Sequence, residues 1–176
     1  MKRIVFFVLI NFQCAFSYCQ SDIERILGEN LDTIIDYRDK TFIIGPFNEK
    51  KDIAGNSYGL WKEFYSSGEL KAEGTLMQRS YTQCCAAGPC EMFYRYKLGE
   101  WEYYYKNGKI KAQGVYDTQV YNFPTSCEGG DDIIIQKLSN NWKYYNKNGL
   151  EPQMPEHMIE EIMTFYTEQG KHIPNK

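Results

Sequence analysis

The chain has 176 residues and a formal net charge of −3, and 43% of its residues are hydrophobic. This length suffices for one domain with a modest core, and an acidic balance without a basic run argues against binding to nucleic acid. Aromatic residues make up 16% of the chain and include 15 tyrosines, which favours half-buried β-strands.

The N-terminus has the plan of a secretory signal peptide. Lys2 and Arg3 form a positive head, Ile4 to Ile10 are apolar, and Ser17 and Cys19 place small side chains before a cleavage site. We therefore predict a signal peptide over residues 1–19 and export to the periplasm, the cell envelope or the medium. The alternatives are a buried N-terminal strand or an uncleaved anchor.

Residues 20–56 are interpreted as a lead-in to the rest of the chain. Ser21 and Glu24 fit a capping box with apolar residues behind it, which predicts a short N-terminal helix. Thr41 to Ile44 is a candidate strand.

Residues 57–153 repeat one pattern. GLWKEFYSSGELKAEGTL matches GEWEYYYKNGKIKAQGVY, and NNWKYYNKNGL begins a third copy about 40 residues later. Such a period is typical of units that are too small to be stable alone and stack on their neighbours. The recurring positions, here called the repeat landmarks, are Trp61, Tyr65, Gly68, Gly74, Trp101, Tyr105, Gly108, Gly114, Trp142 and Gly149.

Each repeat is predicted to be an antiparallel hairpin. Asn107-Gly108 is typical of a type I′ turn, and Ile110 to Tyr116 alternates, with Ala112 and Gly114 on one face and Lys111 on the other. We expect the recurring Ala-x-Gly to make room for a neighbouring tryptophan ring.

Two further features concern the outgoing strands. Trp101 and the recurring aromatic at Tyr104 fall on opposite faces, which requires either a bulge or two partly covered faces. A strand is also expected before each tryptophan, at Thr41 to Ile44, Met92 to Leu98 and Ile133 to Leu138.

The pattern G-x-W-x-x-[FY]-Y-x-x-G-x-[LI]-K-x-x-G resembles the MORN-repeat variant family, hairpin repeats found in YwqK-like antitoxin proteins. Asn141 replaces the leading glycine of the third unit and Glu151-Pro152 interrupts its returning strand, so this unit is expected to act as a cap. The resemblance implies a mainly β fold, an antiparallel hairpin-repeat meander sheet. It also implies interaction or antitoxin-like roles, although export fits poorly with neutralising a cytosolic toxin.

Residues 154–176 are predicted to form a C-terminal capping helix and a tail. The helix begins at Pro155-Glu156, and Gly170 ends it. Its apolar face is expected to plug the open end of the sheet, with a partner-binding helix as the alternative. That face carries Met158, Ile159, Ile162, Met163 and Tyr166.

Four cysteines remain after the signal peptide: Cys84, Cys85, Cys90 and Cys127. An even number in an exported chain favours disulfides. A bond between the adjacent Cys84 and Cys85 would be strained, which leaves Cys84–Cys90 with Cys85–Cys127, or Cys85–Cys90 with Cys84–Cys127. The missing C-x-x-C spacing argues against a zinc site and a redox-active pair.

Motifs for catalysis are missing from the sequence. It contains no G-x-S-x-G, H-E-x-x-H or glycine-rich phosphate loop, and His157 and His172 are interpreted as solvated residues. The acidic run from Glu128 to Asp132 lacks the oxygen spacing of a calcium loop. We therefore expect no catalytic residue, cofactor or metal, and no enzymatic activity.

The expected function is that of an exported protein–protein interaction module whose partner is not identified by the sequence. Tyr103, Tyr105 and Lys111 are the candidate binding residues, because aromatic and basic side chains on one sheet face suit contact with another protein. The alternative is binding of membrane lipid headgroups or envelope glycans through exposed aromatic rows, although net acidity disfavours anionic lipid.

Overall fold

A computed structural model describes residues 32–36, 41–149, 153–167 and 170–174. The chain divides into two units, residues 1–32 and 33–176, and the description below concerns the second. The predicted signal peptide and the predicted helix near Ser21 lie outside the described residues.

The described part of the chain contains ten strands and one helix, α2 (Glu156–Met163). The strands are β1 (Asp32–Asp36), β2 (Thr41–Lys51), β3 (Ser57–Phe64), β4 (Leu70–Cys85), β5 (Gly88–Tyr104), β6 (Ile110–Phe123), β7 (Asp131–Leu138), β8 (Lys143–Tyr144), β9 (Phe165–Thr167) and β10 (Gly170–His172).

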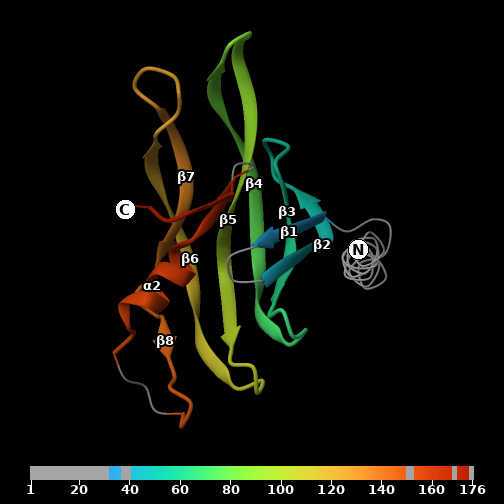
Figure 1. Ribbon diagram of the computed structural model, residues 1–176, viewed down its shortest axis with the longest axis vertical. Helices are drawn as coiled ribbons and strands as arrows, with labels where there is room; N and C mark the ends of the chain where they lie inside the picture. Colours follow the sequence, from blue (N-terminus) through green and yellow to red (C-terminus); the bar gives the residue numbers. More distant parts are fainter. Residues whose placement is uncertain (1–31, 37–40, 150–152, 168–169, 175–176) are drawn as a thin grey trace, which may run out of the picture. The chain divides into compact units, whose positions relative to one another are not determined.

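The strands form one antiparallel meander sheet, as predicted. The order is β1-β2-β3-β4-β5-β6-β7, so each strand pairs with its neighbours in the sequence. β8 pairs with the first part of β6, and β9 pairs with the part of β5 that β6 leaves free. Figure 1 shows β4 and β5 as one long ribbon, with β6 and β7 forming a second.

The segments between the repeats extend the hairpins. The strands expected before the tryptophans are confirmed within β2, β5 and β7. β4 and β5 stay paired from Ala72 and Tyr103 up to Cys85 and Gly88, and β6 and β7 from Tyr116 and Leu138 up to Phe123 and Asp131. We call the outer parts of these hairpins, residues 75–98 and 117–137, the two arms.

The turns of the repeats differ from the type I′ prediction. In each repeat the N–H of the turn glycine donates to the carbonyl three residues earlier, as in Gly108 to Tyr105 at 2.8 Å. Gly68, Gly108 and Gly149 have φ angles of 94°, 77° and 83°, whereas Asn107 has no positive φ. A type I turn followed by a left-handed glycine explains both observations.

A β-bulge follows the turn in the first two repeats and lies on the returning strand. Trp101 and Tyr104 therefore stay on opposite faces, and both faces are partly covered, the second of the two alternatives. Glu63 pairs with Ala72 but Phe64 with Leu70, so Lys71 is the extra residue. Tyr103 pairs with Ala112 but Tyr104 with Ile110, which makes Lys111 the extra residue of the next repeat. A bulge turns its extra residue toward the face of the residue that follows it.

The tryptophans lie against glycines of the preceding hairpin, which confirms the expected role of the Ala-x-Gly pattern. A Cβ atom on Gly74 would lie less than 3.0 Å from the indole of Trp101, and one on Gly114 equally close to Trp142. Gly45 stands in the same relation to Trp61. Since β2 carries Gly45, the array begins one strand before the first repeat found in the sequence.

Hydrogen bonds reinforce this coupling between successive repeats. The Trp101 indole N–H donates to the Thr75 carbonyl at 3.0 Å, and that of Trp142 donates to Val115 at 2.9 Å. The Tyr65 hydroxyl donates to the Tyr104 carbonyl at 2.8 Å, and the hydroxyl of Tyr105 reaches the Tyr145 carbonyl at the same distance. The repeat landmarks therefore bind each hairpin to the next.

The C-terminal segment differs from the predicted helix. α2 ends at Met163, and Tyr166 belongs to β9, which pairs with β10 and with β5. The helix also covers a sheet face and does not plug an end of the sheet, because Met158 and Ile162 are fully buried in the same cluster as Trp101 and Tyr116. Ile159 is 40% exposed, so the buried stripe is narrower than predicted.

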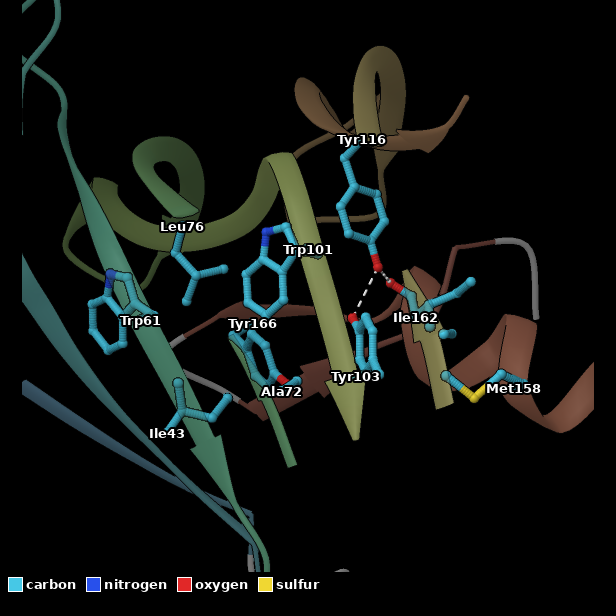
Figure 2. Close-up of a cluster of buried hydrophobic side chains, with 11 residues drawn as sticks. Ile43, Trp61, Ala72, Leu76, Trp101, Tyr103, Tyr116, Met158, Ile162 and Tyr166 are labelled. Carbon is cyan, nitrogen blue, oxygen red and sulfur yellow. Dashed lines mark hydrogen bonds between the residues drawn. The ribbon is translucent and has the colours of Figure 1, made fainter. Parts of the chain in front are cut away.

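The core has two parts, and the first lies on this side of the sheet, which we call the covered face. Figure 2 shows this first part, in which Tyr103 and Tyr116 lie next to Ile162 of α2, while Trp61 lies nearer to Ile43 and Leu76. The second part lies between the arms. It consists of Met77, Tyr81, Tyr94, Tyr96, Phe123, Ile133, Ile135 and Phe165.

The substitution Gly74→Ala tests the indole–glycine contact. We expect it to lower the free energy of unfolding by about 1–3 kcal/mol, because the added methyl group overlaps the Trp101 ring. Urea titration of Gly74→Ala, Trp101→Leu and the double variant measures the coupling. The Gly74→Ala cost should shrink in the Trp101→Leu background, and strictly additive costs would contradict the contact.

Candidate functional site

The predicted binding residues do not form an exposed face. Tyr103 is 1% exposed, because it points toward α2 on the covered face. Lys111 is turned to the same face by its bulge, and Tyr105 uses its hydroxyl to bind the next repeat. The prediction of a surface from Tyr103, Tyr105 and Lys111 is therefore wrong.

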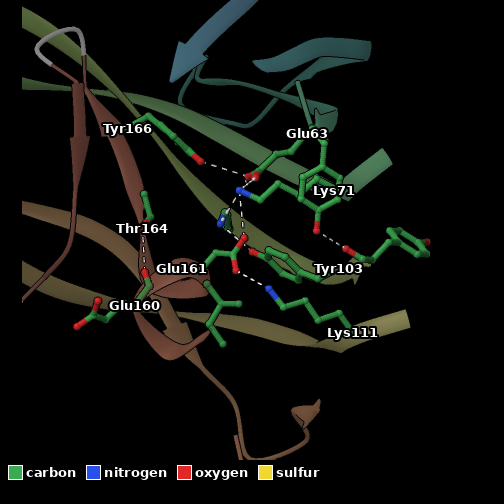
Figure 3. A network of polar contacts seen from close by, with 12 residues as sticks. Glu63, Lys71, Tyr103, Lys111, Glu160, Glu161, Thr164 and Tyr166 are labelled. Atoms are coloured by element: carbon green, nitrogen blue, oxygen red, sulfur yellow. Dashed lines mark hydrogen bonds and ion pairs between the residues drawn. The ribbon is translucent and has the colours of Figure 1, made fainter. Parts of the chain in front are cut away.

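The two bulge lysines bind one carboxylate of the helix. Lys71 Nζ lies 3.1 Å from Glu161 Oε1, and Lys111 Nζ lies 2.8 Å from Glu161 Oε2 (Figure 3). Burial alone would raise the pKa of Glu161, but the two ammonium groups outweigh it and hold the pKa at about 2. Equivalent positions of two repeats thus converge on α2.

A second buried lysine continues the network. Lys97 is 1% exposed, and its ammonium donates to the Tyr103 hydroxyl at 2.7 Å and lies 3.7 Å from Glu63. The Tyr103 hydroxyl lies 2.9 Å from that of Tyr116, which donates to the Ile162 carbonyl at 2.5 Å. Burial raises the pKa of both tyrosines well above the usual value, so both stay protonated as donors.

We call Glu63, Lys71, Lys97, Lys111 and Glu161 the helix-docking cluster. Their charges face one another across the interface between the sheet and α2, and the Tyr166 hydroxyl adds a bond to Glu63 at 3.2 Å. A pocket of about 400 Å³ adjoins the cluster, and Tyr65, Lys71, Lys111, His157 and Glu160 are among its lining residues. Because Glu161 binds both lysines of this pocket, the cluster serves to fix the helix.

The opposite side of the sheet, here called the open face, has a different character. One cross-strand row on it runs through Lys62, Glu73, Glu102, Gln113 and Lys143. No helix or strand among the described residues packs over this row. All five side chains are exposed or only partly buried.

Two carboxylates of the row are direct neighbours. Glu73 pairs with Glu102 in the register of β4 and β5, so two like charges face each other, a pairing that sheets usually disfavour. Lys62 Nζ lies 3.4 Å from Glu73, and the Tyr104 hydroxyl donates to both carboxylates. Burial and these two acceptors raise the pKa of Tyr104 far above its usual value.

A groove follows the open face over the paired repeats. Its volume is about 540 Å³, and three glutamates but only one lysine line it. Two partly buried tyrosines of the recurring aromatic position contact its lining: the Tyr104 hydroxyl donates to the Glu73 and Glu102 carboxylates, and Gln113 donates to the Tyr145 hydroxyl at 3.4 Å. The full lining consists of Leu60, Glu73, Gly74, Glu100, Trp101, Glu102, Gln113, Gly114, Val115, Asn141 and Lys143.

The cysteines form disulfides at the ends of the arms. The pairs are Cys84–Cys127 and Cys85–Cys90, one of the two pairings that the sequence left open. Cys84–Cys127 joins the two arms across a sequence separation of 43 residues. Disulfides are typical of proteins in oxidising compartments.

His172 and the acidic run support the fold, whereas His157 is exposed, as predicted. His172 stacks on Phe165 and lies 2.9 Å from the Thr167 hydroxyl, so it is not a solvated residue, and burial lowers its pKa. Asp131 accepts the Thr82 N–H at 2.7 Å and so ties the arms together. Within the described ranges no group of three or more His, Cys, Asp or Glu side chains is placed to hold a metal ion.

Comparisons with family models, with curated proteins and with solved structures gave no match for this chain. Of the residues that the structure describes, none belongs to a helix with the length and apolar character needed to cross a membrane. The open-face groove is the strongest candidate site, because its three carboxylates are exposed or only partly buried.

The pH dependence of stability tests the helix-docking cluster. A carboxyl group whose folded pKa is depressed stabilises the fold above its unfolded pKa and loses that effect as pH falls through the folded value. The wild type should lose about 1–3 kcal/mol of unfolding free energy between pH 4.5 and pH 2 through Glu161. Urea titration of Glu161→Gln should show a smaller loss of unfolding free energy over this pH range. Glu160→Gln is the matched control and should behave like the wild type. An equal loss in both variants would contradict this role.

Removal of the bond between the arms should be costly. Closing a loop of 43 residues constrains the unfolded chain by about 4 kcal/mol. Cys84→Ser with Cys127→Ser should lower the free energy of unfolding by about 2–4 kcal/mol in urea titration. A change below about 0.5 kcal/mol would show that the arms are held by packing alone.

Proposed function

We propose that this chain is an exported, non-enzymatic interaction module that binds a partner protein through its open face. The observation that carries the proposal is the open-face groove, which is lined by three carboxylates and has two tyrosines, Tyr104 and Tyr145, in contact with its lining. Aromatic side chains with polar tips are the groups that most often anchor protein interfaces.

The division of the sheet into two faces supports this choice. The covered face uses its charged groups to fix α2, through Glu161 and the bulge lysines. On the open face the carboxylates of Glu73 and Glu102 stand side by side, a pairing that sheets usually disfavour. Such a local exception to the rules of the fold is typical of a functional site.

The charge of the groove indicates the chemistry of the partner. Glu73, Glu100 and Glu102 outnumber Lys143 in the lining, so a segment with lysine or arginine side chains complements it. Apolar walls from Leu60 and Val115 can accept the aliphatic stems of such side chains. We therefore propose a partner segment that is basic and partly apolar.

Export remains part of the proposal. The signal-like N-terminus predicts it, and the two disulfides favour an oxidising compartment. The periplasm, the envelope and the medium all meet this requirement.

Glycan binding is the second candidate function. Aromatic rows stack on sugar rings, and Gln113 together with the carboxylates of the groove can accept and donate hydrogen bonds to hydroxyl groups. Binding to anionic lipid headgroups is disfavoured by the same carboxylates. Binding to glycans and binding to lipid are each measured separately from binding to a protein.

The open face is tested with the disulfide-bonded mature chain and two variants, Tyr104→Ala and Glu100→Gln. Capture from envelope extracts should yield a stoichiometric protein with the wild type, and each variant should weaken its binding about tenfold, or about 1.4 kcal/mol. Added salt should weaken it further, because part of the attraction is between charges. The binding constant of the captured protein is measured by calorimetry.

Glu91→Gln is the matched control, since Glu91 is an exposed carboxylate on an arm. It should leave binding unchanged, and melting curves should show that all variants fold. In two parallel experiments, sedimentation with peptidoglycan and with anionic vesicles measures binding to these ligands in place of a protein. Binding to peptidoglycan that depends on Tyr104, or protein binding equal in all variants, would overturn the proposal of a protein partner.

A further inference from the structure

The tip of the first arm concentrates reactive groups in an exposed turn. Ala86 and Ala87 form the turn between Cys85, the last residue of β4, and Gly88, the first of β5. Cys85, both alanines and Pro89 are exposed. Cys84 is exposed as well, so the two disulfides are distinguished by the segments that they join.

The two disulfides hold different parts of the fold. Cys84–Cys127 joins the arms at a place where other bonds also hold them, because Gln83 donates to Ser126 at 2.7 Å and Ser126 donates to the Cys84 carbonyl. Folding brings these two cysteines together from distant parts of the sequence, so the fold in turn protects their bond.

Cys85–Cys90 joins residues within one hairpin. The ladder of β4 and β5 already pairs Gln83 with Cys90 and Cys85 with Gly88, so the hairpin is closed without the bond. A disulfide that closes so short a loop constrains the unfolded chain about half as much as one between the arms. The fold therefore depends less on Cys85–Cys90 than on Cys84–Cys127 as a structural link.

We propose that Cys85–Cys90 is a thiol–disulfide exchange site for an external thiol, while Cys84–Cys127 is the structural bond. An incoming thiolate attacks the exposed sulfur of Cys85, a mixed disulfide forms there, and Cys90 leaves as a thiolate that takes up the proton of the incoming thiol. A dithiol completes the exchange, since its second thiol attacks the mixed disulfide and leaves Cys85 and Cys90 as free thiols.

The spacing of the pair fits the role of the disulfide that is attacked. Four residues separate Cys85 from Cys90, unlike the two of a C-x-x-C oxidoreductase, and no catalytic thiolate is required of this chain. Opening the pair leaves the arms joined through Cys84–Cys127. The exchange can therefore attach a small thiol or a cysteine of another protein to the tip without unfolding the sheet.

The proposal is tested on the oxidised full chain with graded reduced glutathione and, in a parallel arm, with reduced thioredoxin. Native alkylation followed by peptide mass spectrometry should find a glutathione adduct on Cys85 and a free thiol on Cys90. The Cys85–Cys90 bond should open at least about ten times faster than Cys84–Cys127. Preference for glutathione or for thioredoxin identifies a small thiol or a protein dithiol as the reactant.

Two double variants serve as controls. Cys85→Ser with Cys90→Ser should abolish the adduct, whereas Cys84→Ser with Cys127→Ser should retain it. Four results would each overturn the proposal. Cys84–Cys127 could open first, both bonds could open together, the adduct could form mainly on Cys90, or a new Cys85–Cys127 pair could form. The wild-type labelling pattern decides the question even if a variant fails to fold.

Discussion

The contact between an indole ring and a glycine of the preceding hairpin organises this protein. Gly45, Gly74 and Gly114 each lie under the tryptophan of the following hairpin, where no side chain fits. The indole N–H groups of Trp101 and Trp142 complete the contact by binding the carbonyl next to the glycine. One short hairpin has too little apolar surface to be stable alone, so these contacts make successive hairpins into one sheet.

The bulges make the two faces of the sheet different. Each bulge turns a lysine of the repeat toward the covered face, where Lys71 and Lys111 meet Glu161. The helix is thereby fixed on the side that carries the tryptophans. Glu73 and Glu102 stay on the opposite side, where the ladder alternates regularly. A binding function on the open face therefore leaves the contacts that hold α2 undisturbed.

Local patterns predicted much of the fold. Periodicity identified the hairpins, and the Ala-x-Gly pattern identified the site of each indole. The candidate face failed for two reasons. Tyr103 lies on the same side of β5 as Trp101 and so on the covered face, and a bulge, which shows only when two strands are paired, turns Lys111 to the same face. The predicted helix is too long, because Tyr166 pairs with Arg95 of a strand that is distant in the sequence and is therefore part of the sheet. Gly45 was missed because Ile43 replaces the alanine of the later repeats.

The central claim is that each indole ring packs on the glycine of the hairpin before it. Nuclear Overhauser spectra of the folded chain test it directly, because an indole ring at contact distance shifts glycine Hα resonances upfield. The account predicts upfield Hα resonances for Gly45, Gly74 and Gly114, with cross-peaks to the rings of Trp61, Trp101 and Trp142 respectively. Ordinary glycine shifts, or cross-peaks from Gly74 to the indole ring of Trp61 in place of that of Trp101, would contradict it.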